Sequence, residues 1–140
     1  FTSILPPLLV RGVRTALDEM RGPIVLISNL LTEGRGMAGF TAAESARWVS
    51  EAIGRPVDVV IANTGRPSRE GLIQYAAEHK QPLEIGEFDS ETDVVEGRFW
   101  CTEIARHDRR RLSFAVWSVL SGRLLEGTRG RPVQSAQNVQ

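Results

Sequence analysis

The sequence predicts an α/β fold: a Rossmann-like, three-layer arrangement in which a mainly parallel sheet lies between helices. The first observation is a pair of short, almost continuously apolar runs at residues 23–27 and 57–62. Such runs are typical of parallel strands that are buried on both faces. The second observation is that segments with helical spacing of apolar residues precede, separate and follow these runs, as in βαβ units.

Length and composition limit the classes of protein that fit. The 140 residues are enough for one domain with a core, and a formal net charge of zero argues against binding nucleic acid through bulk charge. The single cysteine, Cys101, excludes an internal disulfide, so a reducing, cytoplasmic location is expected. Without an apolar run of about 18 residues, no membrane span is expected. The chain opens on apolar Phe1, which suggests a fragment of a larger domain.

The first helix is expected to start near the prolines at 6–7, with Thr2 or Ser3 as N-cap, and to end at residues 22–23. Its apolar stripe comprises Leu5, Leu8, Leu9, Val13, Ala16, Leu17 and Met20. The second helix, 41–53, has a capping box formed by Thr41 and Glu44. Its predicted inner face comprises Ala43, Ala46, Trp48, Val49 and Ile53.

A third helix is predicted to begin at Pro67 or Ser68. Its predicted inner face comprises Leu72, Ile73, Tyr75, Ala76 and Ala77. Residues 82–85 are interpreted as a short third strand. Residues 94–95 and 99–101 are interpreted as two further short strands, antiparallel and at an edge of the sheet.

Asp108 is predicted to cap a last helix at residues 109–120. That helix would place Leu112, Ala115, Val116, Val119 and Leu120 toward the core. Residues 122–140 lose apolar periodicity and are rich in Gly, Arg, Gln, Ser and Asn, so a polar, disordered tail is expected there. The folded portion would therefore be residues 1–121.

The loop between the first strand and the second helix has the sequence Gly-Arg-Gly-Met-Ala-Gly at residues 34–39, which matches G-x-G-x-x-G. A dinucleotide fingerprint is disfavoured, because its first glycine comes late and Asn63 stands where an acidic residue is expected. Two alternatives remain: a phosphate-binding loop of another kind, and a surface loop whose glycines only make turns. If the loop binds phosphate, its N–H groups and the N-terminus of the following helix would face the ligand.

Right-handed crossovers would bring residues 29–39 and 63–65 to the same edge of the sheet, where open α/β sheets bind ligands. His107 and Asp108 are interpreted as residues preceding and capping a helix, and His79 as a residue of a helix C-terminus. Too few His and Cys residues are present for a structural zinc site, and no metal site is predicted. The arginines at 106 and 109–111 are interpreted as a solvated first helical turn.

Several segments resemble the YvcK-like gluconeogenesis factors and their relative, the 2-phospho-L-lactate transferase CofD. Residues 1–17, FTSILPPLLVRGVRTAL, are similar to a T-S-x-x-P-x-L-L-V segment of that family, and Asn29, Thr32, Gly39 and Thr41 match its strand–loop–helix segment. The segment ARHDRRRLSFAV resembles the family's terminal helix. The loop departs from the family pattern, since only Glu33 remains of two acidic positions and Arg35 is new.

The resemblance implies a Rossmann-like fold that binds a nucleotide or nucleotide sugar, as YvcK-like regulators do, without assured catalysis. The alternative it implies is transfer of a phospholactate-type group from a nucleoside diphosphate to a deazaflavin-like acceptor, with Mg²⁺ as the implied cofactor. The catalytic residues are unknown, and self-association into a homo-oligomer stays open. Together, position and resemblance suggest these ligand-binding residues: Thr2, Ser3, Asn29, Thr32, Gly34, Arg35, Gly36, Gly39, Thr41, Asn63, Thr64 and Gly65.

Overall fold

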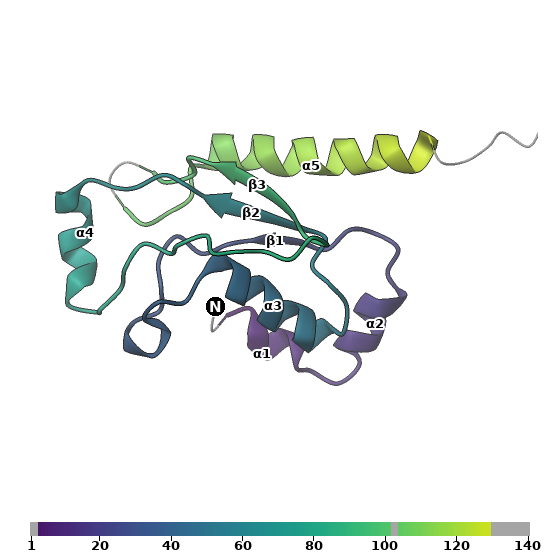
Figure 1. Cartoon of the computed structure of the whole chain (residues 1–140), viewed down its shortest axis with the longest axis horizontal. Helices are drawn as coiled ribbons and strands as arrows, with labels where there is room; N and C mark the ends of the chain where they lie inside the picture. The colour runs from purple at the N-terminus through teal and green to yellow at the C-terminus, as the bar shows by residue number, and fades with distance from the viewer. Residues whose placement is uncertain (1–2, 102–103, 130–140) are drawn as a thin grey trace, which may run out of the picture.

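A computed structural model describes residues 3–101 and 104–129 and contains a parallel three-stranded sheet (Figure 1). The strands β1 (Val25–Ile27), β2 (Val59–Asn63) and β3 (Asp93–Gly97) lie in the order β1-β2-β3. The helices are α1 (Leu5–Leu8), α2 (Val13–Glu19), α3 (Ala42–Ile53), α4 (Arg69–Ala76) and α5 (Arg109–Arg129), with a 3₁₀ turn at Arg35–Met37. Within the described residues, no helix is long and apolar enough to cross a membrane.

Strand β2 is the centre of the core. Val59, Val60, Ile61 and Ala62 are each at most 2% exposed, because strands flank them in the sheet and helices cover both faces. Val60 pairs in register with Leu26 of β1 and with Val94 of β3, and both pairings are parallel. The predicted parallel strands at 23–27 and 57–62 are therefore confirmed; both begin two residues later than predicted, and β2 ends one residue later.

Helices cover the two faces of the sheet, as predicted (Figure 1). On one face, Ala46, Val49 and Ile53 of α3 pack with Leu26 and Val60, and α1 and α2 pack against α3 from outside. On the other face, Ala115 of α5 packs with Ile61 and Phe99, supported by Leu112, Val116 and Val119. The three layers therefore enclose two apolar clusters that share the sheet between them.

The capping box of α3 is confirmed. Thr41 Oγ1 accepts a hydrogen bond from Glu44 N at 3.2 Å, and Glu44 Oε2 accepts one from Thr41 N at 2.9 Å. Gly54 ends the helix with a left-handed φ of 81°, which glycine adopts without the steric cost of a Cβ. A capping box depends on residues three positions apart, so the sequence was enough to predict it.

The single N-terminal helix that the sequence predicts is instead two short ones. Gly12, with φ of 89°, is the N-cap of α2 and separates it from α1. The N-cap of α1 is Ile4, which makes no side-chain hydrogen bond, so Ser3 does not cap the helix as predicted. Thr2 lies outside the described residues. The apolar periodicity continues across the break, which is why it did not reveal the turn.

Two strand predictions are wrong. Residues 82–85 make only isolated bridges, Leu31 with Pro82 and Thr41 with Glu84, so this segment does not join the sheet. Residues 94–95 belong to β3, which is at an edge as predicted but runs parallel to β2 rather than antiparallel. Residues 99–101 form no strand; Trp100 makes one bridge to His107. Short apolar pairs carry no directional information, which only the long-range pairing supplies.

Two predicted inner faces also need correction. Trp48 of α3 is 44% exposed and packs edge-to-face on Phe40, with ring centroids 5.2 Å apart. Helix α4 buries no residue, and Ile73 is 66% exposed. Because α4 lies beyond the end of the sheet rather than on its face (Figure 1), its apolar positions have no layer to pack against.

The last helix is longer than predicted. Asp108 caps it as expected, since its Oδ1 accepts hydrogen bonds from Arg110 N at 3.0 Å and Arg111 N at 3.1 Å. However, α5 continues past Leu120 to Arg129 and projects beyond the sheet (Figure 1). The predicted tail therefore begins inside a helix, and its part at 130–140 lies outside the described residues.

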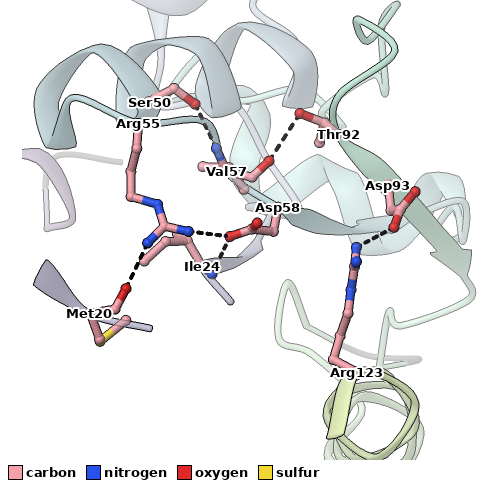
Figure 2. A network of polar contacts seen from close by, with 9 residues as sticks. All are labelled: Met20, Ile24, Ser50, Arg55, Val57, Asp58, Thr92, Asp93 and Arg123. Carbon is pink, nitrogen blue, oxygen red and sulfur yellow. Dashed lines mark hydrogen bonds and ion pairs between the residues drawn. The ribbon is translucent and has the colours of Figure 1, made fainter. Parts of the chain in front are cut away.

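A polar network holds the amino ends of the strands (Figure 2). Asp58 Oδ2 accepts a hydrogen bond from Ile24 N at 2.7 Å and pairs with Arg55 at 3.2 Å, while Arg55 also donates to Met20 O. Next to it, Thr92 Oγ1 donates to Val57 O at 3.1 Å. These contacts join the segments that enter all three strands, and Asp58 is the residue they share most.

We expect Asp58→Ala to lower the free energy of unfolding by about 1–3 kcal/mol, because it leaves Ile24 N and Arg55 without their acceptor. Asp18→Ala, on exposed α2, is the matched control and should change stability by less than about 0.5 kcal/mol. Urea unfolding followed by circular dichroism measures both. Equal stability of the two variants would contradict the structural role of the network.

Candidate functional site

The carboxyl ends of β1 and β2 lie at one edge of the sheet, as predicted. The chain that leaves β3 does not enter α5 directly. It first runs past the carboxyl ends of the strands and reaches the end of β1. His107 Nε2 lies 3.1 Å from Ser28 O, just past the end of β1, and Ala105 N donates to the Tyr75 hydroxyl at 2.8 Å. The described parts of this crossing segment, residues 98–101 and 104–108, are therefore held both to β1 and to α4.

A shallow cleft of about 290 Å³ opens between the crossing segment and the loop after β1. Its lining brings together segments that are far apart in the sequence. The lining residues are Asn29, Leu30, Leu31, Thr32, Glu33, Lys80, Ala105 and His107. We take this cleft as the candidate site, because it combines the carboxyl end of a parallel strand with converging polar groups.

His107 is a half-buried polar side chain of the cleft. Burial lowers its pKa below the ordinary value of 6.5, and the hydrogen bond to Ser28 O opposes this shift only in part. The imidazole is therefore neutral at pH 7. Because a carbonyl oxygen only accepts, Nε2 must carry the proton, and Nδ1 is then an unprotonated acceptor. The side chain can thus accept a hydrogen bond or a proton from a ligand.

The remaining polar groups supply one amide and two opposite charges. Asn29 Nδ2 donates to Glu33 Oε1 at 3.4 Å, a weak contact. Lys80, the only lysine of the chain, pairs with Glu78 at 2.5 Å, and its side chain is 34% exposed. The cleft therefore offers a cation and a carboxamide beside the neutral imidazole.

Thr32 fixes the shape of the cleft rather than lining it with a free hydroxyl. It is 4% exposed, its N–H donates to Gln81 O at 2.8 Å, and its Oγ1 accepts from Gln81 N at 3.0 Å. Leu83 N donates to Leu30 O in the same ladder. This pairing carries Lys80 to the side of Asn29, so the segment misassigned as a sheet strand positions the site instead.

The N-terminus of α3 is closed, which corrects the expectation of free N–H groups there. Ala42 N donates to Glu84 O and Ala43 N to Ile85 O, both at 2.9 Å. Thr41 Oγ1 caps the helix and lies so close to Gly86 that a Cβ there would come within 2.6 Å. The first-turn donors are satisfied inside the protein, so this helix end is not an anion site.

The polar groups at the end of β2 and in the turn after it are likewise hydrogen-bonded within the protein. Asn63 Oδ1 accepts from Gly65 N at 3.1 Å and from Phe99 N at 2.9 Å, and its Nδ2 donates to Gly65 O at 2.6 Å. Thr64 N donates to Gly97 O. Asn63 thus ties the end of β2 to the start of the crossing segment, and neither it, Thr64 nor Gly65 lines the cleft.

The glycines of the loop at residues 34–39 do not line the cleft. Gly34 is buried with φ of 84°, and a Cβ there would lie 3.2 Å from Glu78 O. Gly39, also with positive φ, and Gly36 have no neighbouring atom within 4 Å of the position that a Cβ would take. Residues 35–37 form the 3₁₀ turn.

The structure therefore brings Asn29 and Thr32 together at the cleft, whereas Thr2 and the side chain of Arg35 lie outside what the structure describes. Ser3, Thr41 and the 63–65 turn lie elsewhere. Lys80 and His107 were missed. The sequence contains one signal for His107: it directly precedes the Asp108 cap, in a segment long enough to run past the carboxyl ends of the strands. No local pattern showed that this segment reaches β1.

The described residues do not fit a magnesium site. Glu33 is the only carboxylate lining the cleft, and the described residues contain no group of three or more His, Cys, Asp or Glu side chains arranged to hold a metal. A larger cavity of about 990 Å³ runs along α3 and residues 86–92. The carboxyl ends of the strands do not line it, so it is not the site we favour.

Comparison with known proteins gives the family. The model of the family described as 2-phospho-L-lactate transferase CofD matches residues 1–100. This chain belongs to the CofD family. The chain is 30% identical over 131 residues to the "Putative gluconeogenesis factor" of Aquifex aeolicus, covering 89% of this chain and 40% of that protein. The Thermotoga maritima protein of the same name is 29% identical over 85 residues, covering 61% of this chain and 27% of that protein.

A solved structure confirms the fold. A member of the UPF0052 family from Bacillus halodurans superposes with a TM-score of 0.70 at 24% identity, over 81% of this chain and 38% of that one. This CofD-family chain thus spans less than half the length of the relatives it matches. The resemblance inferred from residues 1–17 and 29–42 is confirmed at the level of family and fold.

The lowered pKa of His107 predicts a pH-dependent stability. The unfolded chain binds a proton near 6.5 while the folded chain resists it, so stability is complete above that pH and falls as the pH drops below it. We expect His107→Gln, whose amide can still donate to Ser28 O, to flatten this dependence. Urea unfolding from pH 5 to 8 measures the difference. A parallel dependence in both proteins would contradict the assignment.

The glycine geometry predicts unequal costs in the loop. Gly34→Ala should destabilise by about 1–2 kcal/mol, because it combines positive φ with a tight contact to Glu78 O. Gly36→Ala meets nothing within 4 Å and should be neutral or stabilise by up to about 1 kcal/mol. Thermal unfolding compares the two, and an equal loss in both would contradict the described loop.

Proposed function

We propose that this CofD-family chain binds a nucleotide or nucleotide-sugar ligand through the cleft after β1, as a regulatory protein would, without assured catalysis. The observation that carries the proposal is the convergence of Asn29, Lys80 and His107 at the carboxyl end of a parallel strand. In open α/β sheets this edge is where ligands bind. The family match supports the proposal but does not name the ligand.

Each polar group has a natural partner on such a ligand. The Lys80 ammonium offers a point charge for a phosphate oxygen. The Asn29 carboxamide both donates and accepts, which suits the edge of a base or a sugar hydroxyl. Nδ1 of neutral His107 accepts a hydrogen bond from a hydroxyl. The satisfied N-terminus of α3 means that phosphate recognition rests on Lys80 rather than on helix donors.

A second candidate is transfer of a phosphorylated group from a nucleoside diphosphate to a deazaflavin-like acceptor, which the sequence resemblance implies; the family description names a 2-phospho-L-lactate transferase. The observation that favours it is the neutral imidazole of His107, which is able to take a proton from an attacking hydroxyl through Nδ1. Against it, the described cleft provides a single carboxylate for a metal, so we route no step through Mg²⁺. The binding function is therefore the one we put first.

We expect Lys80→Ala to weaken binding of the best nucleotide ligand about fivefold to tenfold, because it removes a charge that a phosphate would meet. Arg69→Ala, on exposed α4 and outside the cleft lining, removes the same charge and should leave affinity unchanged. Isothermal titration calorimetry measures both. Equal weakening would mean that only net charge matters, and would overturn the cleft as the site.

A thermal-shift panel identifies the ligand class, since a ligand that binds only the folded state raises the melting temperature. The panel contains UDP-sugars, GDP and free deazaflavin, each with and without Mg²⁺. Stabilisation by a UDP-sugar without metal is the result we expect. Stabilisation by GDP that needs Mg²⁺ and increases with the deazaflavin would replace the binding function with the transferase.

A further inference from the structure

Strand β3 has an unpartnered outer edge. Within the part of the chain that the structure describes, its only strand neighbour is β2. Asp93 N donates to Asp58 O and Gly97 O accepts from Thr64 N, so the backbone of 93, 95 and 97 faces β2. Because these directions alternate along a strand, the N–H and C=O groups of Val94 and Glu96 point away from the sheet. They form a template for another strand.

An apolar cavity lies beside this edge, between β3 and α5, with a volume of about 480 Å³. Val95, Gly97 and Phe99 line it from the strand side, and Phe114 and Ala115 from the helix. Phe114 is 74% exposed, an unusual state for a phenylalanine in the middle of a helix. The free edge and the apolar cavity therefore form one continuous surface, which we call the β3 edge surface.

We propose that the β3 edge surface binds a second copy of this chain, so that the two β3 strands pair antiparallel around a two-fold axis at Val95. In this register, Val94 lies opposite Glu96 of the partner subunit, and each exchanges both backbone hydrogen bonds. Val95 meets Val95 of the partner subunit in a pair without backbone hydrogen bonds, on the face that α5 covers. The groups that β2 leaves unpaired are the ones this register uses.

Charge supports a second copy as the occupant. At the amino end of the strand lie Glu91 and Asp93, of which Asp93 already pairs with Arg123 of α5; at the carboxyl end, Arg98, Arg110 and Arg111 lie beside the cavity. Antiparallel pairing brings Glu91 of one copy toward the basic end of the other. The two Glu96 side chains oppose valines instead of each other, so the register avoids a like-charge pair across the strands.

The shape of α5 fits the same axis. Ser118 lines the cavities on both sides of Val95, so the axis passes close to this serine. The side of α5 toward β3 carries the small residues Ser118 and Gly122 there, which allows a second helix to approach closely. Phe114 then covers the cavity at each end of the contact.

The first test compares Glu96→Pro with Glu96→Ala by sedimentation velocity over a concentration series. Proline removes an N–H that faces away from β2, so the ladder inside the sheet stays intact, as at natural edge strands. We expect the parent chain and Glu96→Ala to dimerise, and Glu96→Pro to raise the dimer dissociation constant at least tenfold. Monomers throughout, or dimers that Glu96→Pro leaves intact, as pairing through β1 would give, would overturn the proposal.

The second test fixes the register by cross-linking and keeps the proposal testable if Glu96→Pro folds poorly. In a Cys101→Ser background, Val95→Cys places two thiols opposite each other, whereas Val94→Cys opposes Glu96 of the partner subunit. Under mild oxidation we expect a disulfide-linked dimer for Val95→Cys and none for Val94→Cys. Equal cross-linking at both positions, or a dimer only with Val94→Cys, would contradict the register.

Discussion

Complete burial of β2 is the constraint on which the rest of the structure depends. Val59, Val60, Ile61 and Ala62 have almost no exposed surface, so each needs a covering layer above and below and a strand on each side. This requirement places α3 on one face and α5 on the other, with β1 and β3 as flanks. Burial of apolar surface contributes about 25 cal/mol per Å² to folding, and β2 supplies three of the largest fully buried side chains of the described chain, Val59, Val60 and Ile61.

The same arrangement explains how a site forms from distant segments. Since α5 covers the face beneath β2, the chain leaving β3 at the far edge has to return across the carboxyl ends of the strands. His107 is carried to β1 by this return, and Tyr75 of α4 holds the crossing segment in place. The ladder between Leu30–Thr32 and residues 81–83 brings Lys80 to the same point. The cleft is thus a consequence of connectivity.

Polar groups at the two ends of the sheet have different tasks. At the amino ends, Asp58 pairs with Arg55, and Asp58, Arg55 and Thr92 each bond a backbone group, so these side chains tie the chain together (Figure 2). At the carboxyl ends, Asn63 is similarly occupied, but His107 keeps an acceptor available. The candidate function rests on this difference, because a group already bonded inside the protein must be released before it can bind a ligand.

Local patterns in the sequence determined the α/β class, the two buried strands, the capping box of Thr41 and Glu44 and the Asp108 cap, since each depends on residues a few positions apart. Tertiary structure alone decided the direction of β3, the break at Gly12, the exposure of Trp48 and the closing of the α3 N-terminus by Glu84 and Ile85. It also decided the site. Asn29 was predictable because it ends a strand, whereas His107 and Lys80 join it through pairings dozens of residues apart, which no local spacing encodes.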